Sequence, residues 1–278
     1  MLANCQDSKF QGMDQSSSTC DRLPSAFGLL QLIRSSLNLA LFVDYDGTLT
    51  PIVARPEQAI MDCQTRNLIS LLSSRFPTSI VSGRSQQQLM ELVGIDEVFY
   101  ASSHGLRIVG PQGSNLECDQ GKPFKYLMDI IYRELGLFLT EIPGIVLEHG
   151  VYTVAVHYRL VSECNALKVY KRIRSLIEHF PDLRLTHGKK VYEIRPRLDW
   201  DKGTAVEWIL SCLERKLVPI YVGDDVTDED AFLRIRERGF GILVSEDSRR
   251  THAKYSLRNS YEVRKFLKEL YEIDLCRF

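Results

Sequence analysis

Two aspartates at one turn are the residues of this chain whose types and spacing point most directly to chemistry. Asp44 and Asp46 stand two positions apart, after the apolar run Leu39–Val43 and before the turn Gly47-Thr48. Two carboxylates at the end of a buried strand repel each other, so they stay ionised most easily with a cation between them. A hard, oxygen-seeking ion such as Mg²⁺ suits the pair, and one carboxylate can then attack an electrophile to give an aspartyl-phosphate. A solvated acidic turn after a strand is the alternative interpretation.

Other residues suited to an anion stand elsewhere in the chain. Ser82-Gly83-Arg84 follows the short apolar run Thr78–Val81, and a hydroxyl, backbone amides and a guanidinium all favour phosphate, although an ordinary loop is the alternative. Lys202 stands at the start of a predicted helix, where a cation is unfavourable unless an anion lies nearby. His104 stands in a turn beside Gly105. It could act as a ligand or a base, and the alternative is a hydrogen-bonded loop residue.

The most acidic stretch of the chain follows another apolar run, Val218–Val222. It contains Asp224, Asp225 and Asp228. Acids also favour a helix N-terminus, which is the structural alternative for this stretch. If its strand runs parallel to the strand before Asp44, the two groups of carboxylates meet at the carboxyl edge of the sheet. Acids from two strands, a lysine and a hydroxyl together predict a magnesium-dependent site for phosphoryl transfer.

A sheet of this kind is what the hydrophobic pattern predicts for much of the chain. Short apolar runs alternate with segments of helical periodicity, which is typical of an α/β fold with a parallel sheet and helices on both faces. The predicted strands are residues 39–43, 78–81, 98–101, 218–222 and 241–244, and the predicted helices are residues 25–38, 62–74, 86–93, 202–214 and 263–271.

A second unit interrupts this alternation. Over residues 111–121 the composition turns to Gly, Pro, Gln, Ser and Asn, which marks a boundary. Beyond it the pattern predicts helix, two strands, helix and two strands (αββαββ), with tight turns at His149-Gly150 and His187-Gly188 that indicate antiparallel hairpins. The prediction is therefore a disordered leader (1–24), a core (25–115 and 197–278) and an inserted α+β domain (116–196).

Composition and charge exclude several classes of function. With 35 basic and 36 acidic residues in 278, the formal net charge is −1, which gives no basis for binding nucleic acid or an anionic membrane. No apolar run approaches the roughly 20 residues that span a bilayer, and the first residues lack the pattern of a secretory signal. Seven cysteines without a C-x-x-C pair favour reduced thiols. We expect a soluble, cytoplasmic protein.

Several motifs, taken in order, resemble those of the trehalose-6-phosphate phosphatases of the haloacid-dehalogenase-like (HAD) superfamily. The resemblance extends from about Leu41 to the C-terminal helix. Its first and last motifs are typical of the superfamily, whereas G-D-D-x-T-D-E together with V-H-Y-R is more particular to the family. The motifs are Asp44–Ile52, Val81–Ser85, Ser103–Gly105, Val156–Arg159, Glu193–Pro196, Trp200–Gly203 and Gly223–Phe232.

The resemblance implies a Rossmann-like HAD core with an inserted cap of the C2B type. It also implies that Asp44 is the nucleophile and that Asp46 protonates the leaving sugar oxygen and then activates water. Ser82 and Lys202 would hold the phosphoryl oxygens. The implied Mg²⁺ ligands are Asp44, the backbone carbonyl of Asp46 and Asp224, supported by Asp225 and Asp228.

The implied reaction is hydrolysis of trehalose 6-phosphate to trehalose and phosphate, with a functional link to a trehalose-6-phosphate synthase. The implied substrate-binding residues are Arg84, Glu148 and Glu193, the two glutamates binding sugar hydroxyls. One departure affects the substrate assignment. Gly150 stands where many relatives carry a lysine two places after the first cap glutamate, and our hypothesis is that His149 or a nearby basic residue compensates.

Three other interpretations remain open at this stage. A phosphatase for glucosylglycerol, mannosylglycerate or sucrose phosphate would keep the chemistry and change the sugar. A phosphomutase shares the D-x-D-G-T start and the cap type, but the G-D-D-x-T-D-E stretch argues against it. A catalytically silent sugar-phosphate-binding module is the alternative from another class, although every acid that the reaction needs is present.

Overall fold

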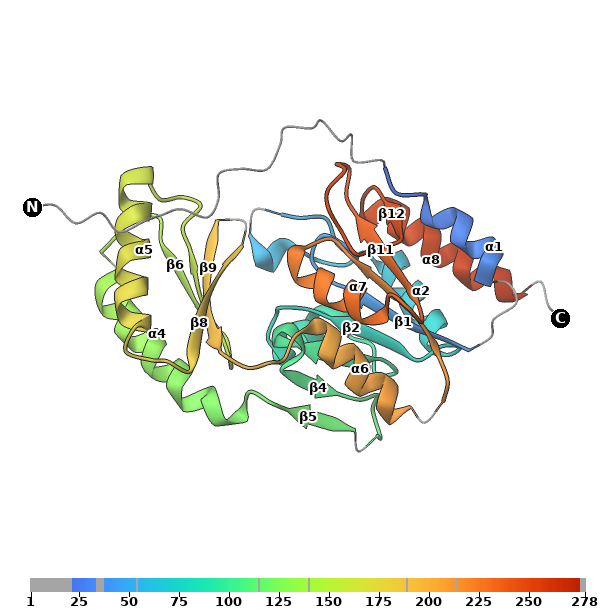
Figure 1. The fold of residues 1–278 in the computed structure, drawn as a ribbon, viewed down its shortest axis with the longest axis horizontal. Coiled ribbons are helices and arrows are strands. Elements are labelled where there is room, and N and C mark those ends of the chain that lie inside the picture. The colour runs from blue at the N-terminus through green and yellow to red at the C-terminus, as the bar shows by residue number, and fades with distance from the viewer. Residues whose placement is uncertain are drawn as a thin grey trace, which may run out of the picture.

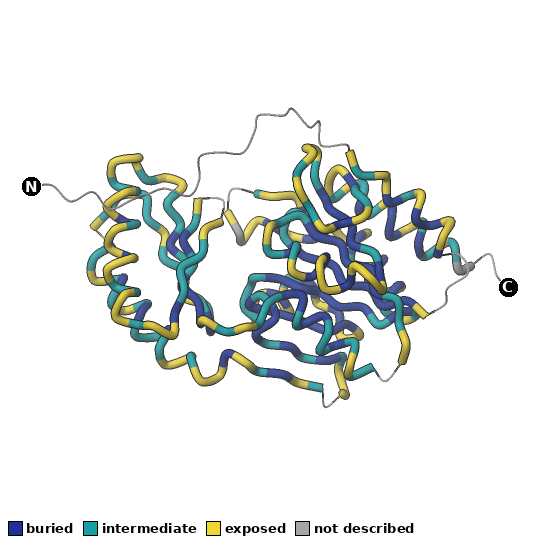
Figure 2. Tube along the Cα trace, viewed as in Figure 1, coloured by how far each residue is buried: buried dark blue, intermediate teal, exposed yellow. Residues whose placement is uncertain are grey.

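The computed structural model describes residues 22–33, 38–53, 55–114, 116–139, 141–188, 190–213 and 215–275. Two sheets of different kinds lie side by side, each with its own helices (Figure 1). We call the part with the eight-stranded sheet the core unit, and the part with the four-stranded sheet the inserted unit. Figure 2 shows that the buried residues concentrate along the strands of the core unit.

The sheet of the core unit has the order β12-β11-β10-β1-β2-β3-β4-β5. Its strands are parallel from β12 to β3, and β4 and β5 extend it in antiparallel fashion. β1 lies between β2 and β10 and is buried along its whole length. The strands are β1 (Leu39–Asp44), β2 (Thr78–Val81), β3 (Phe99–Ser102), β4 (Arg107–Val109), β5 (Glu117–Asp119), β10 (Val218–Gly223), β11 (Phe240–Val244) and β12 (Tyr255–Leu257).

Helices cover both faces of this sheet, as the sequence predicts. Leu41 and Val43 of β1 point to one face and Ala40 and Phe42 to the other, because successive side chains of a strand alternate. The first face packs against α1 (Leu29–Ile33), α2 (Cys63–Ser73), α3 (Gln86–Val93) and α8 (Ser260–Leu275). The second face packs against α6 (Lys202–Cys212) and α7 (Glu229–Ile235).

The inserted unit is an antiparallel sheet with helices on one face only. Its strands, in the order β6-β7-β9-β8, are β6 (Val146–His149), β7 (Val154–His157), β9 (Val191–Pro196) and β8 (Leu183–Gly188). Val154, Val156 and Ile194 pack with α4 (Lys125–Leu139) and α5 (Glu163–Ile177) in a separate hydrophobic core. The residues between them on the same strands point away from these helices, so the other face of the sheet is polar.

Short 3₁₀ turns connect several of these elements. They are η1 (Ala26–Gly28), η2 (Pro56–Gln58), η3 (Ser103–Gly105), η4 (Lys122–Phe124) and η5 (Val226–Asp228). In the described part of the chain, no helix combines the length and the apolarity needed to cross a membrane.

The structure differs from the sequence-based expectation in three places. The strands β4, β5 and β12 were not predicted, and β5 carries the core sheet to Asp119, past the boundary placed at residue 116. The helix expected over 25–38 is η1 followed by α1, and residues 34–37 lie outside the described residues. Residues 1–21 of the predicted leader also lie outside them, whereas the carbonyl of Pro24 accepts the N–H of Ser256 at 2.9 Å.

Candidate active site

The turn after β1 brings the first aspartate against the acidic stretch that follows β10. Asp44 is the last residue of β1 and is only 4% exposed. Gly47 closes the turn with a φ of +87°, and its N–H donates to the carbonyl of Thr50 at 2.9 Å. A side chain at position 47 would collide with the carboxylate of Asp224. Glycine is therefore required both by the backbone angle and by the close approach of Asp224.

Lys202 joins Asp44 to Asp228 in the buried centre of the site. Asp201 caps α6 by accepting the N–H of Thr204 at 2.7 Å, which places Lys202 in the first turn of the helix. The Nζ atom of Lys202 lies 2.8 Å from Oδ1 of Asp44 and 2.8 Å from Oδ1 of Asp228. Burial alone would lower the pKa of Lys202, but the charges of Asp228 and Asp44 overcome it and raise the pKa above its ordinary value. The lysine is therefore an ammonium ion in the fold.

Asp228 is fully buried, and donors from three residues engage its carboxylate. Besides Lys202, the hydroxyl of Tyr221 donates to its Oδ1 at 2.7 Å. The backbone N–H of Asp225 donates to its Oδ2 at 2.9 Å, as part of a capping box at the start of η5. Asp228 thus connects Lys202 to the loop after β10.

The three acids of this cluster fit a divalent cation. Asp44, Asp224 and Asp228 each offer a carboxylate oxygen, and these oxygens lie within 4.8 Å of one another. Burial raises the pKa of Asp44 well above its ordinary value, Lys202 opposes this, and the charges of Asp228 and Asp224 add to it. A cation beside these oxygens would favour the ionised carboxylates. Both carboxylate oxygens of Asp228 already accept hydrogen bonds.

Asp46 has a different partner from Asp44. The guanidinium of Arg84 binds its carboxylate in bidentate fashion, with Nε 2.7 Å from Oδ2 and Nη2 2.6 Å from Oδ1. Ser82 is buried and follows Val81, which is the register partner of Asp44 in the sheet. The Oγ atom of Ser82 accepts the N–H of Arg84 at 3.2 Å. The predicted phosphate loop therefore lies beside both aspartates, and Arg84, predicted to bind substrate, contacts Asp46.

Glu148 lies on the polar face of the inserted sheet. Its Oε2 is 3.0 Å from Nε2 of His157 on the neighbouring strand. The hydrogen bond with His157 lowers the pKa of Glu148 against the effect of burial, and a hydrogen bond with Gln88 and the charge of Arg84 add to this. Because Gln88 and Arg84 belong to the core unit, Glu148 lies where the two units meet.

Glu193 lies on the same polar face and meets another part of the core unit. Its Oε2 is 3.5 Å from Nε2 of His104 and 4.0 Å from Nη2 of Arg195. Burial alone would raise the pKa of Glu193, but the contact with His104 and the charge of Arg195 lower it to about 2. Both predicted cap carboxylates are therefore ionised at neutral pH and face the core unit.

The structure gives no support to the hypothesis that His149 compensates for the lysine missing at position 150. His149 points to the helical face of β6, opposite to Glu148. Its Nε2 is 3.0 Å from Oδ1 of Asp129, and its ring stacks on that of Tyr132 at a centroid distance of 4.6 Å. Both partners belong to α4, so His149 is part of the packing between the sheet and this helix.

Sequence reasoning missed two residues that hold the site residues in place. Tyr221 binds Asp228, but as one residue of an apolar run it gave no sign of its partner. His157 binds Glu148, and here a signal existed, because His157 lies on the face of β7 opposite to Val154 and Val156. The alternation of side chains along the strand could therefore have indicated that His157 points to the polar face.

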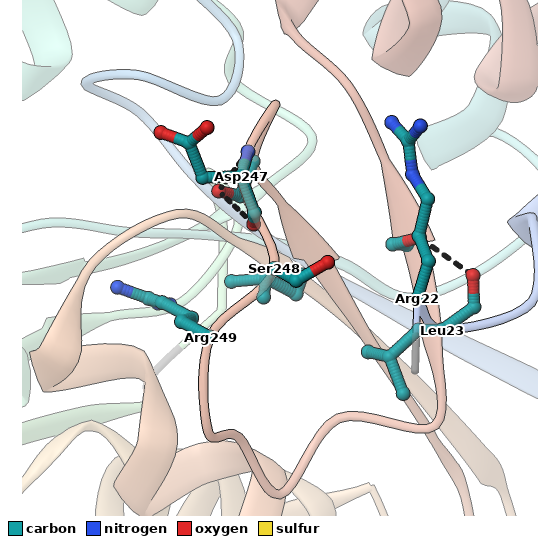
Figure 3. A pocket seen from close by; sticks show the side chains of 8 residues that line it. Arg22, Leu23, Asp247, Ser248 and Arg249 are labelled. Atoms are coloured by element: carbon teal, nitrogen blue, oxygen red, sulfur yellow. Dashed lines mark hydrogen bonds between the residues drawn. The ribbon is translucent and has the colours of Figure 1, made fainter. Parts of the chain in front are cut away.

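Figure 3 shows a pocket that is separate from these residues. It is a shallow pocket that lies where the ends of β11 and β12 meet the first described residues. Arg249 connects it to the acidic stretch by donating to the backbone carbonyl of Asp225 at 3.2 Å. None of the predicted site residues lines it. The lining residues are Arg22, Leu23, Leu243, Ser245, Asp247, Ser248, Arg249 and Ser256.

Comparison with known proteins finds one family over most of the chain. The family model described as "Trehalose-phosphatase" matches residues 42–261. The curated relative "Probable trehalose-phosphate phosphatase 2" of Oryza sativa subsp. japonica is 42% identical over 258 residues, which are 84% of this chain and 68% of the relative.

Solved structures resemble the whole two-unit arrangement. A trehalose-6-phosphate phosphatase related protein has a TM-score of 0.74 at 29% identity, covering 86% of this chain and 100% of that chain. A haloacid dehalogenase-like hydrolase from Bacteroides thetaiotaomicron has a TM-score of 0.58 at 14% identity, covering 84% and 99%. The HAD fold class that the sequence predicts is thereby confirmed.

Proposed function

The chain belongs to the trehalose-phosphatase family of phosphoric monoester hydrolases, and from this premise we propose that it hydrolyses trehalose 6-phosphate through an aspartyl-phosphate on Asp44. The observation that carries the mechanism is the buried ammonium of Lys202 between Asp44 and Asp228, beside Asp224. Lys202 favours the ionised form of Asp44 against the effect of burial and fixes the direction of its carboxylate, and a cation beside Asp224 would favour ionisation further, which is what an attacking nucleophile needs.

The first step transfers the phosphoryl group to the protein. An oxygen of Asp44 forms a bond to phosphorus while the bond from phosphorus to the sugar oxygen breaks. Asp46 gives its proton to that sugar oxygen. To carry this proton, one carboxyl oxygen of Asp46 must first lose its hydrogen bond from Arg84. Ser82 and Lys202 lie at the carboxyl edge of the sheet with Asp44, and they hold the phosphoryl oxygens as charge develops.

The second step restores Asp44. Asp46, ionised after the first step and held again by Arg84, takes a proton from water as the water oxygen attacks phosphorus. The bond from phosphorus to Asp44 breaks, and phosphate leaves. We propose Mg²⁺, held by Asp44, the backbone carbonyl of Asp46 and Asp224, as the cofactor, because these oxygen donors suit a hard ion and its charge would offset that of the phosphoryl oxygens.

The inserted unit is the part that we assign to substrate recognition, as a cap that begins after β5 and extends over residues 120–196. Glu148 and Glu193 stand on its polar face, where they meet the core unit. Ionised carboxylates accept hydrogen bonds from hydroxyl groups, and a disaccharide offers hydroxyls on both of its rings. The two glutamates are therefore suited to binding the sugar while the core unit holds its phosphate.

We propose that the enzyme is cytoplasmic. Cys63, Cys118, Cys164 and Cys212 are free thiols, which suits a reducing compartment. A glycosyltransferase that joins a sugar to a sugar phosphate would supply a phosphorylated disaccharide, and we propose a functional link to a trehalose-6-phosphate synthase on that ground. A physical complex with the synthase is not required by this link.

Phosphate release from a panel of sugar phosphates tests the substrate. We expect magnesium-dependent release from trehalose 6-phosphate with a kcat/KM at least about tenfold above that for glucose 6-phosphate, sucrose 6-phosphate or glucosylglycerol phosphate. A chelator in excess is expected to stop the reaction, and added MgCl₂ to restore it. Equal release from every sugar would contradict the assignment, and release from none would favour a silent binding module.

Gly150 is the observation that keeps a second glycosyl phosphate as a candidate substrate. Its N–H donates to the carbonyl of Thr153 at 2.8 Å, and a side chain at position 150 would collide with Oγ1 of Thr153. A lysine at this position would therefore have to displace the side chain of Thr153. A preference for glucosylglycerol or sucrose phosphate in the panel would mean that the cap recognises a different sugar with the same chemistry.

Arg84→Lys is expected to lower kcat by about 10- to 100-fold. A lysine cannot hold a carboxylate in bidentate fashion, so Asp46 would be a poorly directed base for the second step. Breakdown of the aspartyl-phosphate would then limit turnover, and rapid-quench kinetics would find a burst of trehalose ahead of phosphate. Arg133→Lys, at an exposed position of α4, is the matched control. An unchanged kcat would show that Arg84 does not direct Asp46.

A further inference from the structure

His104 belongs to the core unit, yet its side chain contacts a carboxylate of the inserted unit. Its Nε2 lies 3.5 Å from Oε2 of Glu193, and the imidazole is only 12% exposed. His104 has no role in the proposed steps of phosphoryl transfer. Its position between Glu193 and the phosphate loop nevertheless requires an explanation.

The backbone at His104 is held in an unfavourable conformation. Ser103 has a φ of +49° and His104 a φ of +57°, both in the left-handed region that non-glycine residues rarely adopt. The loop is clamped to the phosphate loop by two hydrogen bonds, from Ser103 N–H to Arg84 O at 2.8 Å and from His104 N–H to Ser82 O at 2.9 Å. Such strain persists where the surroundings fix it, and it is common at functional sites.

The imidazole fills the space between the phosphate loop and the inserted sheet. A side chain at Gly83 would meet Cε1 and Nε2 of His104, each at 2.8 Å, so the ring lies directly on this glycine. Nδ1 is buried and has no hydrogen-bond partner among the described residues. Burial lowers the pKa of His104, Arg195 adds to this, and Glu193 opposes it, so the ring is neutral at neutral pH. A neutral ring with its proton on Nε2 donates toward Glu193.

We propose that His104 is a positioning residue for substrate specificity, which orients Glu193 toward the sugar and fixes it relative to the loop that holds the phosphate. The inference rests on the proposed function and deepens it. The sugar and the phosphate are recognised by different units. The site can therefore distinguish one sugar phosphate from another only if the two units keep a fixed position relative to each other. The contact from His104 to Glu193 joins the two recognition elements directly.

Two substitutions of the same histidine separate positioning from structural support. In His104→Gln the amide nitrogen can take the place of Nε2, whereas in His104→Asn it takes the place of Nδ1 and cannot reach Glu193. Asparagine tolerates a positive φ better than glutamine does. A purely structural role therefore predicts that asparagine is the better replacement, and a positioning role predicts glutamine.

The readout compares trehalose 6-phosphate with p-nitrophenyl phosphate, which carries no sugar for the inserted unit to bind. For the full chain with MgCl₂ we expect His104→Asn to raise KM for trehalose 6-phosphate about tenfold, the effect of losing one hydrogen bond to a charged group. Its kcat/KM for p-nitrophenyl phosphate stays within about twofold of wild type. His104→Gln recovers most of the KM for the sugar phosphate.

A double-mutant cycle with Glu193→Gln completes the test. If His104 acts through Glu193, His104→Asn adds little to the KM change once Glu193 has been replaced. Additive effects, an equal loss on both substrates, or asparagine outperforming glutamine would each overturn the inference. A different outcome is that the wild-type chain hydrolyses p-nitrophenyl phosphate but not trehalose 6-phosphate. That result would overturn the proposed substrate, and the sugar for which His104 positions Glu193 would then be a different one.

Discussion

Asp44→Asn is expected to reduce phosphate release from trehalose 6-phosphate by at least about 10⁴-fold, a loss typical of removing a nucleophile. The amide cannot form the bond to phosphorus, while the contact with Lys202 and the shape of the buried side chain are nearly unchanged. The measurement is initial-rate phosphate release with MgCl₂ at saturating substrate. Asp247→Asn, an exposed acid outside the site, is the matched control and should retain wild-type activity.

The same substitution is expected to raise the free energy of unfolding in metal-free buffer at pH 7. Burial raises the pKa of Asp44 in the fold above its unfolded value. The native state therefore binds more protons than the unfolded state between these two values, and stability falls as pH rises through that window. Asparagine carries no charge, so it removes the free-energy cost of ionising a buried carboxyl group. Urea denaturation in the presence of a chelator measures the free energy of unfolding of both proteins. A lower stability for Asp44→Asn would mean that the bond from Asp44 to Lys202 outweighs the cost of burying Asp44.

Lys202→Met is expected to lower the free energy of unfolding by about 3–5 kcal/mol and to abolish phosphate release. The substitution leaves Asp44 and Asp228 buried without the ammonium that both contact. Because the pKa of Lys202 is raised in the fold, its stabilisation is present in full below its unfolded pKa of about 10.4 and is lost only as pH rises further. Urea denaturation at pH 7 therefore measures the whole effect.

The double variant Asp44→Asn/Lys202→Met provides the control for this experiment. It removes one of the two carboxylates that the methionine would leave uncompensated, so we expect it to be more stable than Lys202→Met alone. Equal stability of Lys202→Met and wild type would show that these carboxylates bind protons in the fold rather than pairing with the lysine.

The places of the main site residues could be predicted because each follows an apolar run. Asp44 is the last residue of β1, and Ser82 and Asp224 come directly after β2 and β10. Parallel strands bring their carboxyl ends to one edge of the sheet. The strands β4, β5 and β12 could not be predicted, since each has only three residues. In such short segments the hydrophobic pattern is too brief to indicate a strand, and pairing with a neighbour decides the conformation.

The contacts between side chains were the least accessible part of the site. Arg84 suited a phosphate by its type, but its bidentate bond to Asp46 depends on rotamers and on the path of two loops. His104 was open to two interpretations in the sequence, because nothing there reveals that two successive residues take positive φ. The contact of His104 with Glu193 crosses from one unit to the other, and no local sequence pattern records such packing.

The position of β1 between β2 and β10 also determines when the protein can become active during its synthesis. The partners of β1 on one side come from residues 78–81, but those on the other side come from residues 218–222. Until the ribosome has made that second partner, β1 is an apolar edge strand, which is the kind of segment that aggregates. The inserted unit, whose strands pair only with one another, can fold in the meantime. The site around Asp44 is therefore assembled late, and a nascent chain that stops before β10 lacks both a complete site and a protected central strand.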